Sequence, residues 1–274
     1  MAGTAEIDEP HGRGEALEDA RQAVGERASA ARDVVGERAS AAKEAVEASA
    51  SAAREAAGEA IAAIKPRLRG RSHEWAFFTS LGLGVALIAA ADTTKATVAM
   101  AIYALSVSAL FGTSALYHRI DWKRPRARQW MRRLDHSMIF VLIAGTYTPF
   151  ALLVLDGPLA DGILIAVWTG ALVGSIVEML WMSHPKWVSA LIYLAVGWIA
   201  IVSLPSMLDE VGVGGMLLIG GGGLLYTVGA VIYAIQRPNP SPAVFGYHEI
   251  FHLLVIAAAA AHFTAVAIYA LPAG

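Results

Sequence analysis

The chain contains no cysteine, and only 16% of its 274 residues are charged. Without cysteine there can be no disulfide, iron–sulfur cluster or thiolate zinc site, so a metal would have to be held by His, Asp or Glu. Soluble domains average about 25% charged residues, whereas 56% of this chain is hydrophobic and its mean hydropathy is +0.53. This composition excludes a disordered chain and does not fit an ordinary cytosolic enzyme.

The first segment is a repeat of eleven residues. Its aligned blocks read AVGERASAARD (23–33), VVGERASAAKE (34–44), AVEASASAARE (45–55) and AAGEAIAAIKP (56–66). Eleven residues complete three turns, which is typical of a long helix that is straight or gently right-handed. The apolar face is mostly alanine, so we expect residues 1–66 to form a solvated, cytoplasmic helix or a partly disordered tether. The alternative is a helix on the membrane or against a partner, but 13 acidic against 8 basic residues up to Lys65 disfavour anionic lipid.

Apolar segments near the length of a bilayer, about 20 residues each, follow one another from Trp75 onward. We predict seven transmembrane helices at residues 75–91, 96–117, 135–155, 160–181, 187–204, 211–235 and 248–271. These segments lack the polar–apolar alternation of a β-barrel. The predicted fold class is therefore all-α: a seven-transmembrane helical bundle over 67–274, preceded by the Ala-rich repeat.

Lys and Arg residues gather at alternate ends of the predicted helices. Four of them lie between residues 65 and 71, and seven lie in the predicted loop 118–134, whereas Lys95 is the only cation of the opposite loops. Because cytoplasmic loops are enriched in Lys and Arg, this pattern predicts a cell-membrane protein with its N-terminus inside and its C-terminus outside. A basic membrane hairpin is usually a topology signal, so we expect membrane lipid, and no nucleic acid, as the partner.

Ionisable residues inside membrane spans are rare and energetically costly, which makes them functional candidates. The second span ends in Ser114-Ala-Leu-Tyr-His118, Asp135 opens the third, and His248 and His252 open the seventh. His248 and His252 are four residues apart and share one helix face. Three imidazoles around one ion, with an open fourth position, form a catalytic zinc geometry. Its water would become a nucleophile near neutral pH; Asp135 could take the proton and Ser114 could donate a hydrogen bond.

The remaining histidines favour structural roles. We interpret His136, His184 and His262 as hydrogen-bonded residues rather than ligands, and His262 lies ten residues beyond His252, about 15 Å along a helix. Glu178, near the end of the fourth span, is either a group supporting the metal site or a helix–helix hydrogen bond.

Residues 248–252 read H-E-x-x-H, the zincin signature in which the glutamate is the general base. Five-residue matches arise by chance, and the longer pattern H-E-x-x-H-x-x-G-x-x-H is absent because no x-x-G-x-x-H follows His252. An intramembrane metalloprotease is therefore an alternative, and Glu249 is the residue that discriminates it.

Three separated motifs carry a family resemblance: SALYH (114–118), LDHSMIFVLIAGTYTPF (134–150) and FGYHEIFHLLVIAAAAAHF (245–263). Together they resemble the hemolysin III family, the bacterial branch of the progestin and adipoQ receptor group. The resemblance covers residues 75–271 and leaves the repeat outside. It implies a seven-helix fold with a cytoplasmic N-terminus and a zinc ion near the cytoplasmic face.

The resemblance also implies roles for individual residues. In the receptor branch, zinc is held by three histidines that match His118, His248 and His252, and the matches of Ser114 and Asp135 lie beside the zinc and its water. That branch commonly has Gln at the position of Glu249, so a base role for Glu249 is not implied. The wider superfamily includes alkaline ceramidases, which implies lipid amide hydrolysis.

The sequence therefore predicts a zinc-dependent membrane hydrolase acting on a lipid amide or ester. The alternative to an enzyme is a receptor-like or pore-forming (cytolytic) membrane protein whose zinc only fastens spans two, three and seven together. No row of polar residues at helical spacing runs through any span, so nothing in the sequence specifies a pore.

The charge pattern makes a direct prediction about topology. A reporter fused after Gly274 should be located outside the cell, and one inserted near Pro125 should be located inside, because the basic loop stays in the cytoplasm. Reporter activity in intact cells measures both. The opposite pair of locations would contradict the charge argument and place the histidines at the other face.

Overall fold

The computed structural model describes residues 66–181 and 184–274, and, before them, residues 35–53 and positions 21, 22, 24, 25, 27, 29 and 32. The chain divides into two compact units, residues 1–63 and 64–274. In the first unit, residues 35–53 are helical and exposed, as expected for a solvated helix. The other positions of the repeat lie outside the described residues, and the domain boundary at residue 66 stays a prediction.

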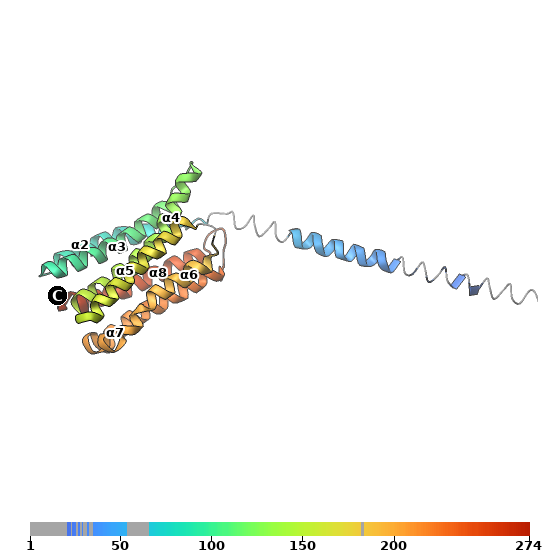
Figure 1. The fold of residues 1–274 in the computed structure, drawn as a ribbon. Coiled ribbons are helices and arrows are strands. Elements are labelled where there is room, and N and C mark those ends of the chain that lie inside the picture. Colours follow the sequence, from blue (N-terminus) through green and yellow to red (C-terminus); the bar gives the residue numbers. More distant parts are fainter. Residues whose placement is uncertain are drawn as a thin grey trace, which may run out of the picture. The chain divides into compact units, whose positions relative to one another are not determined.

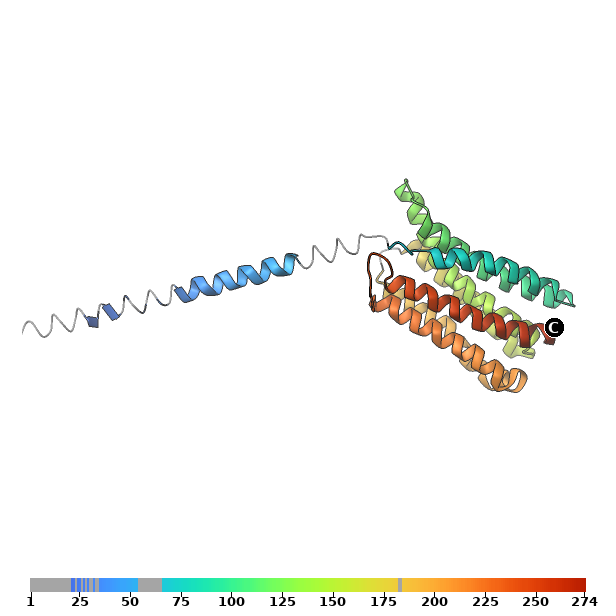
Figure 2. The same cartoon turned by 180° about the vertical axis from the view of Figure 1, so that it is seen from behind.

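The second unit is a bundle of seven α-helices (Figures 1 and 2). They are α2 (Arg71–Ala89), α3 (Thr94–Arg119), α4 (Pro125–Leu153), α5 (Gly157–Leu180), α6 (Lys186–Gly197), α7 (Leu204–Ile235) and α8 (Tyr247–Ala265). A 3₁₀ helix, η1 (Trp198–Ser203), joins α6 to α7, while the π-helical η2 (Val266–Ala270) and the 3₁₀ helix η3 (Leu271–Ala273) continue α8. The residues that the structure describes form no strand, so the predicted all-α class is confirmed.

Among the described residues, five helical stretches are long and apolar enough to cross a membrane: α3, α4, α5, the run Lys186–Ile235, and Tyr247–Ala273. α2 is not among them, and its first turn carries Arg71, His73 and Glu74. The run Lys186–Ile235 has 50 residues, about 75 Å of helix, which is far more than one crossing needs. Because α7 packs against α6, this run folds back on itself.

Two predicted loops have different boundaries in the structure. The segment 205–210 is helical, and the backbone instead leaves the helical conformation at Gly212, whose φ of 63° suits glycine. α4 begins at Pro125, so much of the predicted basic loop 118–134 is helix. Both differences have one cause: proline is well tolerated in the first turn of a helix, so Pro125 and Pro205 start helices rather than interrupt them.

Small residues let the helices approach closely, as is common in membrane bundles. Gly170 and Gly174 on α5 have the four-residue spacing typical of such contacts, and both positions face neighbours. A Cβ at Gly170 would lie 3.0 Å from Val196 of α6, and one at Gly174 would overlap the Phe140 ring of α4. Phe140 is fully buried. These two glycines therefore let α5 pack closely between α4 and α6.

Gly174→Ala should destabilise the bundle by about 1–3 kcal/mol, because the added methyl overpacks the Phe140 contact. Gly162→Ala is the matched control on the same helix: nothing lies within 4 Å of its Cβ position, so better helix propensity should raise stability by up to about 1 kcal/mol. Thermal unfolding of the purified protein in detergent measures both. Equal behaviour of the two variants would show that the contact does not constrain the bundle.

Candidate metal centre

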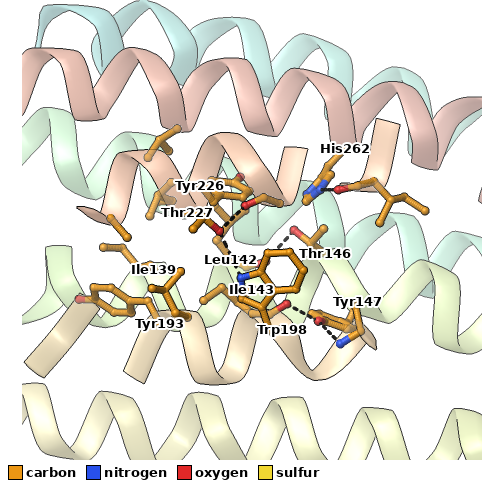
Figure 3. Close-up of a pocket in the computed structure, with 18 of the residues that line it drawn as sticks. Ile139, Leu142, Ile143, Thr146, Tyr147, Tyr193, Trp198, Tyr226, Thr227 and His262 are labelled. Atoms are coloured by element: carbon orange, nitrogen blue, oxygen red, sulfur yellow. Dashed lines mark hydrogen bonds between the residues drawn. The ribbon is translucent and has the colours of Figure 1, made fainter. Parts of the chain in front are cut away.

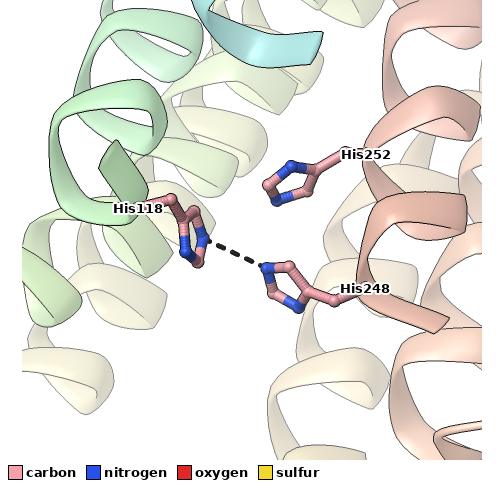
Figure 4. A group of neighbouring side chains, drawn as sticks. All are labelled: His118, His248 and His252. Carbon is pink, nitrogen blue, oxygen red and sulfur yellow. Dashed lines mark hydrogen bonds between the residues drawn. The ribbon is translucent and has the colours of Figure 1, made fainter. Parts of the chain in front are cut away.

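Three buried histidines converge where α3 ends and α8 begins (Figure 4). His118 lies in the last turn of α3, and His248 and His252 lie one turn apart at the start of α8. One nitrogen from each ring lies within 4.8 Å of the others, and His248 Nε2 is 3.1 Å from His118 Nε2. The structure thus brings together the three histidines that the sequence singled out.

The donor set fits a metal ion. Two nitrogens bound to one tetrahedral zinc at 2.0–2.1 Å lie about 3.3 Å apart, close to the 3.1 Å between His118 and His248. Imidazole suits Zn, Cu, Fe and Ni. In addition, Nδ1 of His252 is buried and has no hydrogen-bond partner among the described residues. Three convergent imidazole nitrogens can therefore hold a metal ion.

Asp135 and Ser114 lie beside these histidines, and both are buried. Oδ2 of Asp135, on α4, is 3.7 Å from Nε2 of His118. Ser114 is one helical turn before His118 on α3, and its hydroxyl donates a hydrogen bond to the Asp135 side chain. The carboxylate and the hydroxyl therefore face the same small volume as the three imidazoles.

Glu249, the central residue of the H-E-x-x-H match, is engaged elsewhere. Its Oε1 is 2.5 Å from Nε of Arg69, and its Oε2 accepts a 2.7 Å hydrogen bond from the backbone N–H of Gly246. Both carboxylate oxygens are thus occupied by the start of α8 and by the segment before α2. This arrangement does not present Glu249 as a general base beside the histidines.

His73 lies next to the metal-binding group and was not singled out from the sequence. Its ring stacks on His252, with centroids 3.7 Å apart and planes at 11°. The side chain is buried, and neither nitrogen has a hydrogen-bond partner in the part of the chain that the structure describes. The feature that could have identified His73 is its position in the first turn of α2, at the same end of the bundle as His118 and His248.

His136, His184 and Glu178 have structural partners. His136 is hydrogen-bonded to Tyr233 at 3.0 Å and to the carbonyl of Arg132 at 2.9 Å. Glu178 of α5 accepts a 2.6 Å hydrogen bond from Ser189 of α6 and lies 3.3 Å from His184. The helix–helix interpretation of Glu178 is therefore confirmed.

A mostly apolar cavity extends from this centre into the bundle, and Figure 3 shows part of its lining, including Tyr226 and His262. The volume of this cavity is about 200 Å³. His73, Ser114, Asp135, His248 and His252 line one end. The lining continues along α4, η1, α7 and α8, and it includes His262. The candidate metal centre is thus the polar end of an apolar cavity.

Comparison with known proteins identifies the family of this chain. The chain matches the family described as "Haemolysin-III related" over residues 61–263. It is 36% identical over 180 residues to "Hemolysin-3" of Bacillus cereus (66% of this chain and 78% of that protein). It is 34% identical over 172 residues to "Hemolysin-3 homolog" of Bacillus subtilis (strain 168), covering 63% and 77%.

A human protein is also similar. The chain is 30% identical over 168 residues to "Monocyte to macrophage differentiation factor" of Homo sapiens, covering 60% of this chain and 67% of that protein. The family match spans α2 to nearly the end of α8, and therefore includes all three converging histidines. The chain is a multi-pass membrane protein that belongs to the haemolysin-III related family.

Proposed function

We propose that this protein is a zinc-dependent hydrolase of a lipid amide or ester. One observation carries the proposal: three buried histidines converge, and two of them line the polar end of an apolar cavity together with a carboxylate and a hydroxyl. Metal-ligating, proton-accepting and acyl-binding groups then lie within one site. That combination suits a substrate with a long apolar chain and a polar carbonyl group.

His118, His248 and His252 would hold the zinc ion through imidazole nitrogens, and three protein ligands leave a fourth position open. When bound there, zinc supplies polarisation of a carbonyl oxygen and activation of a water molecule near neutral pH. The ligands come from two helices, so the bundle fixes their separation before any substrate binds. Stacking of His73 on His252 restricts the plane of that ring.

Asp135 is the proton carrier in this proposal. A carboxylate oxygen of Asp135 takes a proton from the attacking water and passes it to the leaving nitrogen or oxygen. The carbonyl carbon thereby gains a hydroxyl group as its bond to the leaving group breaks. The Ser114 hydroxyl, which donates to Asp135, holds the carboxylate in place.

The apolar cavity would bind the acyl chain and exclude water. Ile139, Leu142, Ile143 and Val255 line it, and they offer no polar group to the chain. Burial of each methylene contributes roughly 0.8 kcal/mol, so a long chain supplies ample binding energy. The carbonyl of the substrate would then lie at the histidine end, where the polar side chains are.

Zinc binding provides the first test. Purified protein should contain about one zinc per chain, and His248→Ala or His252→Ala should remove it, because two remaining ligands bind weakly. Mass spectrometry of the metal content measures this. His184→Gln is the control, since His184 lies beside Glu178 and outside the ligand group. Full zinc retention in both alanine variants would contradict the assigned ligands.

Proton transfer provides the second test. Asp135→Asn should retain zinc and lose about 10²–10⁴-fold in turnover of a fluorescent ceramide, since the amide keeps the shape but cannot take a proton. Asp161→Asn is the control: Asp161 is exposed in the first turns of α5 and lies outside the histidine group, so this variant should keep its turnover.

Each alternative function gives a different pattern in the same assay. A metalloprotease using H-E-x-x-H would lose its activity in Glu249→Gln and be much less sensitive to Asp135→Asn. A receptor-like or pore-forming protein with structural zinc would show no hydrolysis in the wild type, and Asp135→Asn would alter only its stability.

A further inference from the structure

The cavity has a second polar region, remote from the metal centre. His262 and Tyr226 both line the cavity (Figure 3), with ring centroids 5.5 Å apart. His262 follows His252 by ten residues on α8, which places it about 15 Å farther along the helix axis. If the polar end of a long-chain ligand lies at the metal centre, the middle of its chain therefore lies near His262.

Two atoms of this region are buried and lack any hydrogen-bond partner among the described residues: Nδ1 of His262 and the hydroxyl of Tyr226. Buried polar groups in native proteins are nearly always hydrogen-bonded, and an exception indicates an unseen water, ion or ligand. Neighbouring polar groups of the cavity lining have hydrogen-bond partners. Tyr147 donates to the carbonyl of Gly197, Thr146 donates to that of Leu142, and Trp198 donates to Thr227.

The protonation of His262 is determined by its other nitrogen. Nε2 lies 3.0 Å from the carbonyl oxygen of Ile219 on α7, and a carbonyl only accepts, so Nε2 carries the proton. Nδ1 of the neutral ring is then an acceptor. Gly222 allows this contact, because a Cβ at that position would overlap the His262 ring. The cavity thus presents an acceptor at His262 near a phenolic donor at Tyr226.

We propose that His262 and Tyr226 form a subsite for a hydroxyl group on the chain of a bound lipid. A hydroxyl is small, donates one hydrogen bond and accepts another, so it satisfies both atoms at once. The ligand class is a long-chain lipid hydroxylated near the middle of the chain, with its carbonyl end at the histidine group. The proposal rests on the proposed function for the presence of a lipid in the cavity, and it adds which lipids are preferred.

Ricinoleate and oleate are the probes, because they differ by a single mid-chain hydroxyl. Binding to the full-length, zinc-loaded protein in detergent is measured by displacement of a fluorescent fatty acid. We expect ricinoleate to bind about tenfold more tightly than oleate, since a buried donor and a buried acceptor both gain partners. A hydroxyoleate with its hydroxyl next to the carboxyl group should bind no better than oleate.

Two variants test whether Tyr226 produces the preference for ricinoleate over oleate. Tyr226→Phe removes only the phenolic oxygen and should reduce the ricinoleate preference to about threefold or less. Thr146→Val is the matched control, because it removes a hydroxyl of the same cavity lining that already has a partner in Leu142. That control should retain the full tenfold preference.

Equal affinity of the wild type for ricinoleate and oleate would overturn the subsite and assign the two atoms to a bound water molecule. An unchanged preference in Tyr226→Phe would overturn it as well. The comparison of ligands in the wild type does not depend on any variant folding correctly. Failure of both fatty acids to bind would overturn the lipid occupant itself, whereas lack of ceramide hydrolysis alone would leave the binding preference intact.

Discussion

The ion pair between Arg69 and Glu249 determines how the two parts of the candidate metal centre meet. A buried carboxylate is strongly unfavourable unless it is paired and hydrogen-bonded, and Glu249 satisfies this requirement through Arg69 and Gly246. Because Glu249 directly follows His248, holding its carboxylate also fixes the first turn of α8. The segment before α2 is further tied to the loop before α8 by the hydrogen bond from Arg67 N–H to the Ala243 carbonyl.

The same segment also contacts the other half of the centre. Gly70 has a φ of 77°, and a Cβ there would lie 2.6 Å from Cβ of His118. The chain before α2 thus packs on His118 through Gly70 and binds Glu249 through Arg69. The separation of His118 from His248 therefore depends on a short stretch that contributes no metal ligand.

The cavity wall depends on a different constraint: backbone N–H and C=O groups need hydrogen-bond partners where a helix is interrupted inside a membrane. α6 ends at Gly197, and the 3₁₀ turn that follows leaves backbone groups that lipid cannot satisfy. The hydroxyl of Tyr147 donates to the carbonyl of Gly197 at 2.6 Å and accepts from the N–H of Ala200 at 2.7 Å. Tyr147, Gly197 and Ala200 all line the cavity. An interruption that would otherwise be unfavourable in a membrane thus becomes part of a stable cavity wall.

Local patterns in the sequence were sufficient to predict the apolar segments and the convergence of the three histidines. Hydropathy located the apolar segments, and the four-residue spacing of His248 and His252, with His118 at the end of another span, indicated one site. His73 was missed because a single histidine before an apolar segment has no local pattern, and its importance comes from stacking on His252. The Arg69–Glu249 pair joins residues 180 positions apart, and only the packing of the bundle reveals such a contact.

The H-E-x-x-H match shows why a motif needs its three-dimensional surroundings before it indicates chemistry. In a zincin, the glutamate lies free beside the metal and acts as the base. Here the same spacing keeps the two histidines on one face of α8, while the glutamate is held by Arg69 and by the backbone of the helix start. The carboxylate that lies beside the histidines is instead that of Asp135, which comes from α4 and has Ser114 as its hydrogen-bond donor. Since the ligands and the carboxylate come from three helices, the site can assemble only when α3, α4 and α8 pack together.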